Sequence, residues 1–442
     1  MLVIFAPVIT RSSNNEKVIL KTSLSLAVAM ASTQLFASGF ALNEQSISGM
    51  GTGFAGRSSA ADDASTVFGN PAGMSRLKRQ QITGGVAAID ASTDISDASG
   101  SRSGTNKGDM VPFTAVPMGY YVKPIDDQWA FGLGVYAPFG LITDYENGFQ
   151  GRNFGSKSEV KVITFQPTVS YAFNDKVSIG FGPTINRISG TLESALTTPL
   201  SPNDGRVQIK GDDIGYGYNI GLLVQATDTT RVGLTYHSKV KYKLEGHTEV
   251  SPGAGTPGAL LRGARYDASL DITTPESADL SVTQDLNDAW KLYAGATWTR
   301  WSRLKDITVQ NEGVTASAGG LLAPGALSSI KEEQNWHDTW AYAIGTSYQL
   351  NKQWVLRTGL SFDQSPANNT NRSPRIPTGD RTIFSLGAGW SPTEDLTIDV
   401  AYSYLKEEKV KINNRNPQLG QSYSSEYENS ANGFGVGATY RF

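Results

Sequence analysis

The last nine residues alternate strictly between two kinds of side chain. Positions 434, 436, 438, 440 and 442 are Phe, Val, Ala, Tyr and Phe, whereas the positions between them are Gly, Gly, Thr and Arg. Successive side chains of a strand point to opposite faces, so this segment predicts one apolar, aromatic face and one small or polar face. Where such segments recur, the pattern is typical of a barrel with lipid outside and a polar lumen inside.

The same alternation recurs along the chain. It is clear at 129–135, 165–173, 340–348, 354–362, 384–390 and 396–404. Short turn-like connections alternate with long polar ones, as they do between the periplasmic and outer ends of membrane barrels, and about fourteen strands result. The sequence therefore predicts an all-β protein, a transmembrane antiparallel β-barrel whose chain begins and ends on the periplasmic side.

Composition excludes several other classes of protein. No run of about 18 apolar residues exists, so a helical membrane protein is excluded. The chain has no Cys and a formal net charge of −3, which argues against disulfide scaffolds, thiolate metal sites and nucleic-acid binding. We expect no cofactor and no metal.

The N-terminal part does not follow the barrel pattern. Lys17 and Lys21 precede a short apolar run and a small residue at Ala37, which predicts a secretory signal peptide over 1–37, with 1–16 consistent with a mis-assigned start. Residues 38–80 lack alternation and are rich in small residues, with a short helix expected around Ala60–Ala64. We expect 38–80 to be a hatch that plugs the lumen of a barrel formed by 81–442, because a barrel this wide would otherwise leak.

Motifs inside the N-terminal segment carry a family resemblance. Gly39-Phe40-Ala41-Leu42-Asn43-Glu44 is followed by Ala61-Asp62-Asp63-Ala64 and by Asn70-Pro71-Ala72. With further matches such as 274–276, 298–302 and 362–366, the mature chain resembles the outer-membrane long-chain fatty acid transporter family. The resemblance implies a monomer in the bacterial outer membrane, in contact with lipid and lipopolysaccharide. It also implies hatch residues with a gating role: Phe40, Asn70, Pro71 and Ala72.

The third strand contains a predicted irregularity. Pro138, Phe139 and Gly140 follow one another within it, and Pro cannot donate a ladder hydrogen bond while Gly weakens a strand. In the family, a kink in this strand provides a sideways exit into lipid. The resemblance thus implies passive uptake through an outer groove, an inner pocket and a lateral exit.

The cargo-binding residues depart from the family pattern. The resemblance places Ser194 where family members can carry a basic residue, and it places a second basic position near Lys331 or at His337, beside Trp336. The odd number of His337 assigns its side chain to the lumen face of its strand. Four leucines in otherwise polar loops are expected to be exposed and are candidates for the landing groove: Leu196, Leu200, Leu260 and Leu261. The implied cargo is a long-chain fatty acid or another apolar small molecule, with neutral aromatic hydrocarbons as the alternative.

Two other classes of function remain as alternatives. An outer-membrane lipase or esterase would need a nucleophile motif, and no G-x-S-x-G elbow exists, although His337 with Asp338 and a distant Ser stays open. A non-selective porin would need an open lumen, which the N-terminal segment argues against. We therefore expect a transporter and not an enzyme.

Overall fold

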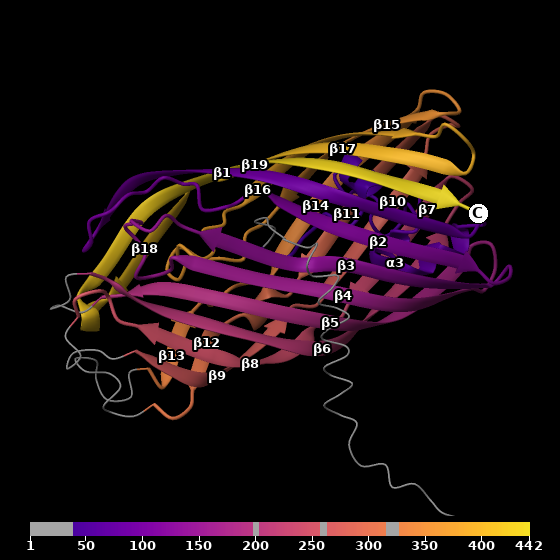
Figure 1. Ribbon diagram of the computed structural model, residues 1–442. Helices are drawn as coiled ribbons and strands as arrows, with labels where there is room; N and C mark the ends of the chain where they lie inside the picture. The colour runs from indigo at the N-terminus through magenta and orange to yellow at the C-terminus, as the bar shows by residue number, and fades with distance from the viewer. Residues whose placement is uncertain (1–38, 198–202, 257–262, 315–326) are drawn as a thin grey trace, which may run out of the picture.

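The described chain is one antiparallel sheet that closes on itself. The structure is a computed structural model that describes residues 39–197, 203–256, 263–314 and 327–442. The first strand pairs with the last, from Gln81 with Arg441 to Gly100 with Tyr423. The result is the fourteen-stranded barrel seen side-on in Figure 1, as predicted.

The sheet of the described residues consists of nineteen consecutive strand segments. They are β1 (Gln81–Gly100), β2 (Thr114–Pro124), β3 (Trp129–Asp144), β4 (Lys157–Ala172), β5 (Val177–Leu196), β6 (Gly205–Gln225), β7 (Thr230–His237), β8 (Val240–Ser251), β9 (Ala264–Thr274), β10 (Ser277–Asp285), β11 (Trp290–Thr299), β12 (Asp306–Asn311), β13 (Ser329–Glu333), β14 (Thr339–Gln349), β15 (Trp354–Asp363), β16 (Arg381–Trp390), β17 (Leu396–Glu407), β18 (Val410–Asn416) and β19 (Gln421–Arg441). Two short 3₁₀ turns, η2 (Trp301–Arg303) and η4 (Pro417–Leu419), lie between strands.

Some barrel strands are interrupted. The segments β7 and β8 both pair with β6, so they are two halves of one barrel strand. Four further barrel strands are likewise divided into two consecutive segments: β9 and β10, β11 and β12, β13 and β14, and β17 and β18. Among the described residues, no helix is long and apolar enough to cross a membrane.

The outward face of the barrel follows the predicted alternation. In β19, Phe434, Val436 and Tyr440 are exposed, whereas Gly435 and Thr439 between them are buried. Aromatic residues beside the short turns are also exposed on the wall, among them Trp129, Trp290, Trp354 and Trp390. Tryptophan favours membrane interfaces, so these rings mark the edge of the apolar band beside the short turns.

At the opposite end, several strands are longer than a bilayer requires. β5, β6 and β19 contain 20, 21 and 21 residues, whereas about 9–11 tilted residues cross the hydrocarbon core. Parts of the long polar stretches 193–213, 245–263 and 413–429 therefore continue the ladder instead of forming loops. Polar side chains in these stretches do not break the strands, because both faces meet water or protein above the membrane.

The N-terminal segment (residues 39–80) packs inside the barrel. It contains α2 (Ile47–Gly51), α3 (Thr66–Gly69) and η1 (Pro71–Arg76), which lie within the barrel near its C-terminal end in Figure 1. α2 contacts β1, β15, β16, β17 and β19, and η1 contacts β2 to β6. The helix expected around Ala60–Ala64 is absent, because Asp63 accepts the N–H of Ser65 and Ala61 has a φ of 52°.

Candidate functional site: an inner pocket beside an irregular third strand

The third strand is bulged where Pro138 was expected to disturb it. Tyr136 pairs with Thr164 and Phe139 pairs with Val162, so β3 carries one extra residue relative to β4. On its other edge, β3 pairs with β2 only as far as Val135. We call the described stretch of β3 without a β2 partner, residues 136–144, the unpaired edge of β3.

The N-terminal segment hydrogen-bonds to β3 at this bulge. Ala41 forms an antiparallel bridge with Phe139. The N–H of Leu42 donates to the carbonyl of Pro138, and the N–H of Gly140 donates to the carbonyl of Phe40, each at 2.8 Å. Pro138 lacks an N–H but keeps its carbonyl, so a proline is compatible with this bridge.

An aromatic cluster packs against this bridge. The ring of Phe40 lies 4.9 Å from Trp301, 5.8 Å from Phe139 and 6.1 Å from Trp336, measured between centroids. Gly39 has a φ of 64°, and a Cβ there would lie 2.5 Å from the Trp336 ring, so glycine is required. The structure thus brings together Phe40, Phe139 and Trp336 from three separate sequence predictions. It adds Trp301, for which the only sequence signal is its place in a family motif.

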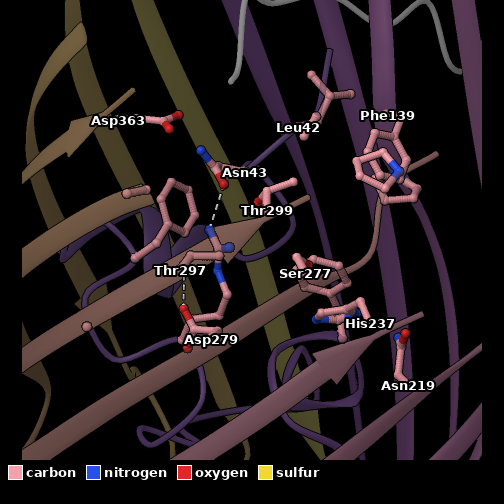
Figure 2. Close-up of a pocket in the computed structure, with 18 of the residues that line it drawn as sticks. Leu42, Asn43, Phe139, Asn219, His237, Ser277, Asp279, Thr297, Thr299 and Asp363 are labelled. Atoms are coloured by element: carbon pink, nitrogen blue, oxygen red, sulfur yellow. Dashed lines mark hydrogen bonds between the residues drawn. The ribbon is translucent and has the colours of Figure 1, made fainter. Parts of the chain in front are cut away.

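The bulge borders an inner pocket. Leu42, Phe54, Phe68, Tyr136, Pro138 and Phe139 form apolar parts of its lining. Polar lining comes from opposite walls, and Asn43, Asn219, His237, Asp279 and Asp363 are labelled around it in Figure 2. The pocket can therefore hold an amphipathic molecule, with its apolar part near the unpaired edge of β3.

Arg57 is the cation of this pocket. Its Nη2 donates to Asn43 Oδ1 at 2.7 Å, shown by a dashed line in Figure 2, and its guanidinium lies 5.5 Å from the Phe54 ring centroid. Its Nε is buried and has no hydrogen-bond partner. Within the described part of the chain, no carboxylate forms an ion pair with it. Sequence reasoning missed Arg57, because nothing in its neighbourhood distinguishes it from a solvated arginine.

The pocket carboxylates already have partners. Asp279 accepts hydrogen bonds from Ser58 Oγ at 2.5 Å and from Thr297 Oγ1 at 2.6 Å. Asp363 forms an ion pair with Arg381 at 3.2 Å. Among the described residues that line the pocket, Arg57 is therefore the charged group that lacks a counter-ion.

A buried polar network joins the bulge to the N-terminal segment. Gln166 of β4 accepts hydrogen bonds from Tyr136 Oη at 2.5 Å and from Asn219 Nδ2 at 2.6 Å. Its own amide donates to the carbonyl of Val67 at 2.9 Å. Movement of α3 would therefore disturb the partner of Tyr136, immediately before the bulge.

Asn70 fixes the other side of the N-terminal segment to the wall. Its Nδ2 donates to the carbonyls of Ser58 at 2.7 Å and Leu222 at 3.0 Å, and its Oδ1 accepts the N–H of Ala72 at 3.0 Å. Pro71 occupies the first position of η1, where a missing N–H costs nothing. Asn70, Pro71 and Ala72 are buried together.

An apolar groove approaches the pocket from the outer end. Its walls come from Ile188, Leu192, Leu244, Leu270, Ile272 and Val309. Ile188 and Leu244 belong to the same cluster as Val240, and Phe139 packs against that cluster. Because Val240 and Phe139 also line the inner pocket, the apolar surface is continuous from groove to pocket.

Several predicted ligand residues lie elsewhere. His337 is exposed, in contrast to the lumen-facing position expected for it, because the interruption between β13 and β14 changes which residues face inward. Lys331 faces outward in ion pairs with Asp306 at 3.8 Å and Glu333 at 3.6 Å. Ser194 lies at the outer end of β5 and is not among the residues that line the inner pocket.

Of the four leucines predicted to line the landing groove, Leu196 lies within the described residues. Leu196 is buried with Val207, Val250 and Tyr266, in contrast to the exposed position expected for it, because the rim strands pack against one another. Leu200, Leu260 and Leu261 lie outside the described residues.

Two polar clusters hold the outer loops. Arg375 ion-pairs with Glu332 at 2.9 Å and donates to Ser158 Oγ at 3.0 Å. Asp204 binds both Arg102 and Arg152. Burial works against ionisation of Asp204, but the hydrogen bonds from the two arginines outweigh it and lower its pKa. In the described ranges, no group of acidic or histidine side chains could hold a metal ion.

Comparisons place this geometry in a known family. Residues 28–442 match the family described as outer membrane protein transport protein (OMPP1/FadL/TodX). A long-chain fatty acid transport protein of Escherichia coli O6:H1 is 30% identical over 455 residues, covering 96% of this chain and 98% of that protein. Outer membrane protein P1 of Haemophilus influenzae is 28% identical, covering 95% and 98%.

Solved structures agree with the fold. A Pseudomonas aeruginosa FadL homologue superposes with a TM-score of 0.82 at 28% identity, covering 91% of this chain and all of that one. The Ralstonia pickettii toluene transporter TbuX, at 18% identity and a TM-score of 0.65 over 87% of this chain and 95% of that one, shares the fold. The chain belongs to the OMPP1/FadL/TodX family of outer-membrane transport proteins.

Proposed function

We propose that this protein takes up long-chain fatty acids across the outer membrane by passive diffusion, as a monomer. The supporting relatives are named long-chain fatty acid transport proteins. The observation that carries the route is that Pro138 and Phe139 belong both to the pocket lining and to the unpaired edge of β3. Cargo enters through the apolar groove, rests in the pocket and leaves sideways at this edge.

The physical reason for such a route is the cost of acyl chains in water. Each exposed CH₂ costs about 0.8 kcal/mol relative to burial, so a wide aqueous pore gives an acyl chain no advantage. The groove and the apolar half of the pocket provide contact along the whole path. No energy source is needed where the concentration of cargo falls inward.

The guanidinium of Arg57 favours a cargo with a negatively charged head group. A hydrogen bond to a charged partner contributes about 1.5–3 kcal/mol, and Arg57 has a buried nitrogen without a partner. A fatty acid carboxylate can form an ion pair with this guanidinium, whereas a neutral aromatic hydrocarbon cannot. Asn186, Asn219, His237 and Thr297 also line the pocket, and these polar groups suit a polar head group better than an arene.

In this route the N-terminal segment acts as a hatch, separate from the barrel that begins at Gln81. Residues 38–80 would block the lumen through the Asn70 contacts and would release cargo at the bridge between Phe40 and Gly140. A hydrolytic role has less support. Asp338 accepts the N–H of Ser302 at 3.1 Å, and among the described residues no serine hydroxyl hydrogen-bonds to a histidine ring.

The test compares binding and uptake of oleate, its methyl ester and toluene. Arg57→Gln should weaken oleate binding by about 10-fold or more, because about 1.4 kcal/mol corresponds to a factor of ten. Binding of methyl oleate should change little, and Arg57→Lys should retain part of the oleate affinity. Arg79→Gln, at the periplasmic end, is the matched control. Equal loss for oleate and its ester, or toluene uptake that exceeds oleate uptake, would contradict a carboxylate cargo.

The exit is tested by removing the extra residue of β3. Deletion of Ala137 should restore the β3 register and allow pairing with β2, so uptake should fall while oleate binding stays measurable. Uptake at the normal rate by the folded deletion variant would show that cargo does not leave at β3. Large, steady single-channel currents through the unaltered protein would instead indicate a porin.

A further inference from the structure

Four neighbouring barrel strands are interrupted at one common level. The interruptions lie at 238–239, 275–276, 300–305 and 334–338. The register aligns them, because Ser277 pairs with His237 on one side and Thr299 on the other, and Thr299 pairs with Thr339. A shared level suggests a common environment rather than four separate irregularities.

That level coincides with the outer edge of the membrane. The segments between the periplasmic turns and the interruptions, β7, β10, β11 and β14, contain 8, 9, 10 and 11 residues. About 9–11 residues of a tilted strand cross the hydrocarbon core, so β10, β11 and β14 have the length of the apolar band and β7 is one residue shorter.

Exposed aromatic side chains mark the same boundary. The rings of Tyr218 and Tyr236 lie 6.2 Å apart, and those of Trp340 and Tyr342 lie 6.1 Å apart. Tyr218, Trp340 and Tyr342 are 40%, 44% and 50% exposed. Tyrosine and tryptophan concentrate at the headgroup level, so the interruptions lie where outer-leaflet headgroups begin.

Cations gather at this level on the outward side. We call Lys239, Lys241, Arg300 and Lys305 the outer basic belt. Lys241, Arg300 and Lys305 are exposed, and Lys239 is half-buried. Lys241 alternates with the buried Val240 and Tyr242, and Lys305 follows the buried Leu304, so both face away from the lumen.

The lysines of the belt lack protein counter-ions. In the ranges that the structure describes, no ion pair involves Lys239, Lys241 or Lys305, and Arg300 reaches Glu276 only at 3.4 Å. Glu276 is engaged by Arg303 through both carboxylate oxygens. Of the other nearby acids, Asp306 forms an ion pair with Lys331 at 3.8 Å. Asp338 accepts the N–H of Ser302, and Asp213 accepts the N–H of Lys243.

We propose that the outer basic belt binds the phosphate groups of lipid A, the membrane anchor of lipopolysaccharide. Lysine and arginine recognise phosphate through charge-assisted hydrogen bonds. The belt stands directly above outward apolar residues of the band, including Leu234 and Leu280, which are 45% and 51% exposed. A diphosphorylated glycolipid thus meets cations with its headgroup and an apolar wall with its acyl chains. Binding at this belt does not depend on which cargo the protein carries.

The experiment uses the full-length protein in nanodiscs and measures binding of purified lipid A. The quadruple variant Lys239→Gln, Lys241→Gln, Arg300→Gln, Lys305→Gln should bind diphosphorylated lipid A at least 10-fold more weakly. A control variant removes the same charge at the periplasmic end: Lys123→Gln, Lys176→Gln, Lys291→Gln, Lys352→Gln. This control should bind like the unaltered protein.

Two further arms identify the bound group. Dephosphorylated lipid A should bind the unaltered protein and the quadruple variant equally weakly, and inorganic phosphate should not displace lipid A. A charge-preserving variant, Lys239→Arg, Lys241→Arg, Lys305→Arg, should keep its affinity for lipid A. This result would show that the quadruple variant loses binding through its lost charge and not through misfolding. Unchanged lipid A binding by the folded quadruple variant, or an equal loss in the periplasmic control, would overturn the proposal.

Discussion

The side-chain amide of Asn70 donates a 3.0 Å hydrogen bond to the carbonyl oxygen of Leu222, which ties the N-terminal segment to β6. The same amide reaches Ser58, and the Asn70 oxygen caps η1 at Ala72. One buried side chain therefore holds a turn inside the segment and fixes that turn to the barrel wall.

Replacement of Asn70 separates these two roles. Asn70→Asp keeps the oxygen acceptor for Ala72 and loses both amide donors, and Asn70→Ala loses all three hydrogen bonds. Each buried partner left unsatisfied costs about 1–3 kcal/mol. We expect both variants to form the barrel, judged by heat-modifiable migration, but to take up less oleate. Asn174→Ala, in a periplasmic turn, is the control, and normal uptake by folded Asn70→Ala would exclude a gating role.

Gly221 provides the space that Asn70 needs. A Cβ on Gly221 would lie 1.9 Å from Asn70 Oδ1. Gly221→Ala should therefore displace the segment at a cost of about 1–3 kcal/mol, the range for overpacking a filled interior. Thermal unfolding and protease cleavage within 39–80 are the measurements. Gly119→Ala is the matched control, because no atom lies within 4 Å of a Cβ there, and equal stability of the two variants would contradict the packing argument.

Phe40 should stabilise the bridge between the N-terminal segment and β3. Phe40→Ala removes a ring that is 2% exposed and contacts three others. Such truncations cost about 3–5 kcal/mol. Hydrogen exchange at the N–H groups of Leu42 and Gly140 should therefore accelerate strongly. Phe113→Ala, at a side chain that is 68% exposed, should leave both rates unchanged; if Phe40→Ala did the same, the cluster would not hold the bridge.

Asp204 should make the outer loops sensitive to acid. The pKa of Asp204 is lowered in the folded protein. Its ion pairs therefore stabilise the outer loops fully above the ordinary carboxyl pKa, and this stabilisation is lost as the pH falls through the lowered value. The stabilisation by Asp204 is therefore lost below about pH 4. The Ala195 N–H donates to the backbone carbonyl of Arg152 at 2.9 Å. This N–H should become less protected from exchange below that pH, after correction for intrinsic exchange. Asp204→Asn should be less protected at neutral pH and should lose the transition; an identical pH profile in both would contradict this role.

The predictions from sequence succeeded where local periodicity decides the structure. The alternation ending at Phe442 specified a strand and its lipid face, because side-chain direction in a strand depends only on residue parity. Pro138 marked the place of the bulge, because a missing N–H affects its own ladder position in any context. The short turns were found for the same local reason.

The predictions failed where an interruption in a strand changes which residues face the lumen, and where strands continue beyond the membrane. His337 was assigned to the lumen by counting, but the interruption before β14 reverses the count, and nothing local reveals it. Leu196 was expected to be exposed, although the strands continue past the bilayer and bury it.

The sequence by itself determined a lipid-facing barrel with a non-alternating N-terminal segment, because those properties repeat every second residue and need no knowledge of distant partners. Only the tertiary structure decided that Arg57 faces the pocket, that Trp301 joins Phe40, and that four interruptions share one level with the outer basic belt. These are relationships between residues far apart in the chain, fixed by strand register and by the path of the N-terminal segment through the lumen, and no local pattern encodes them.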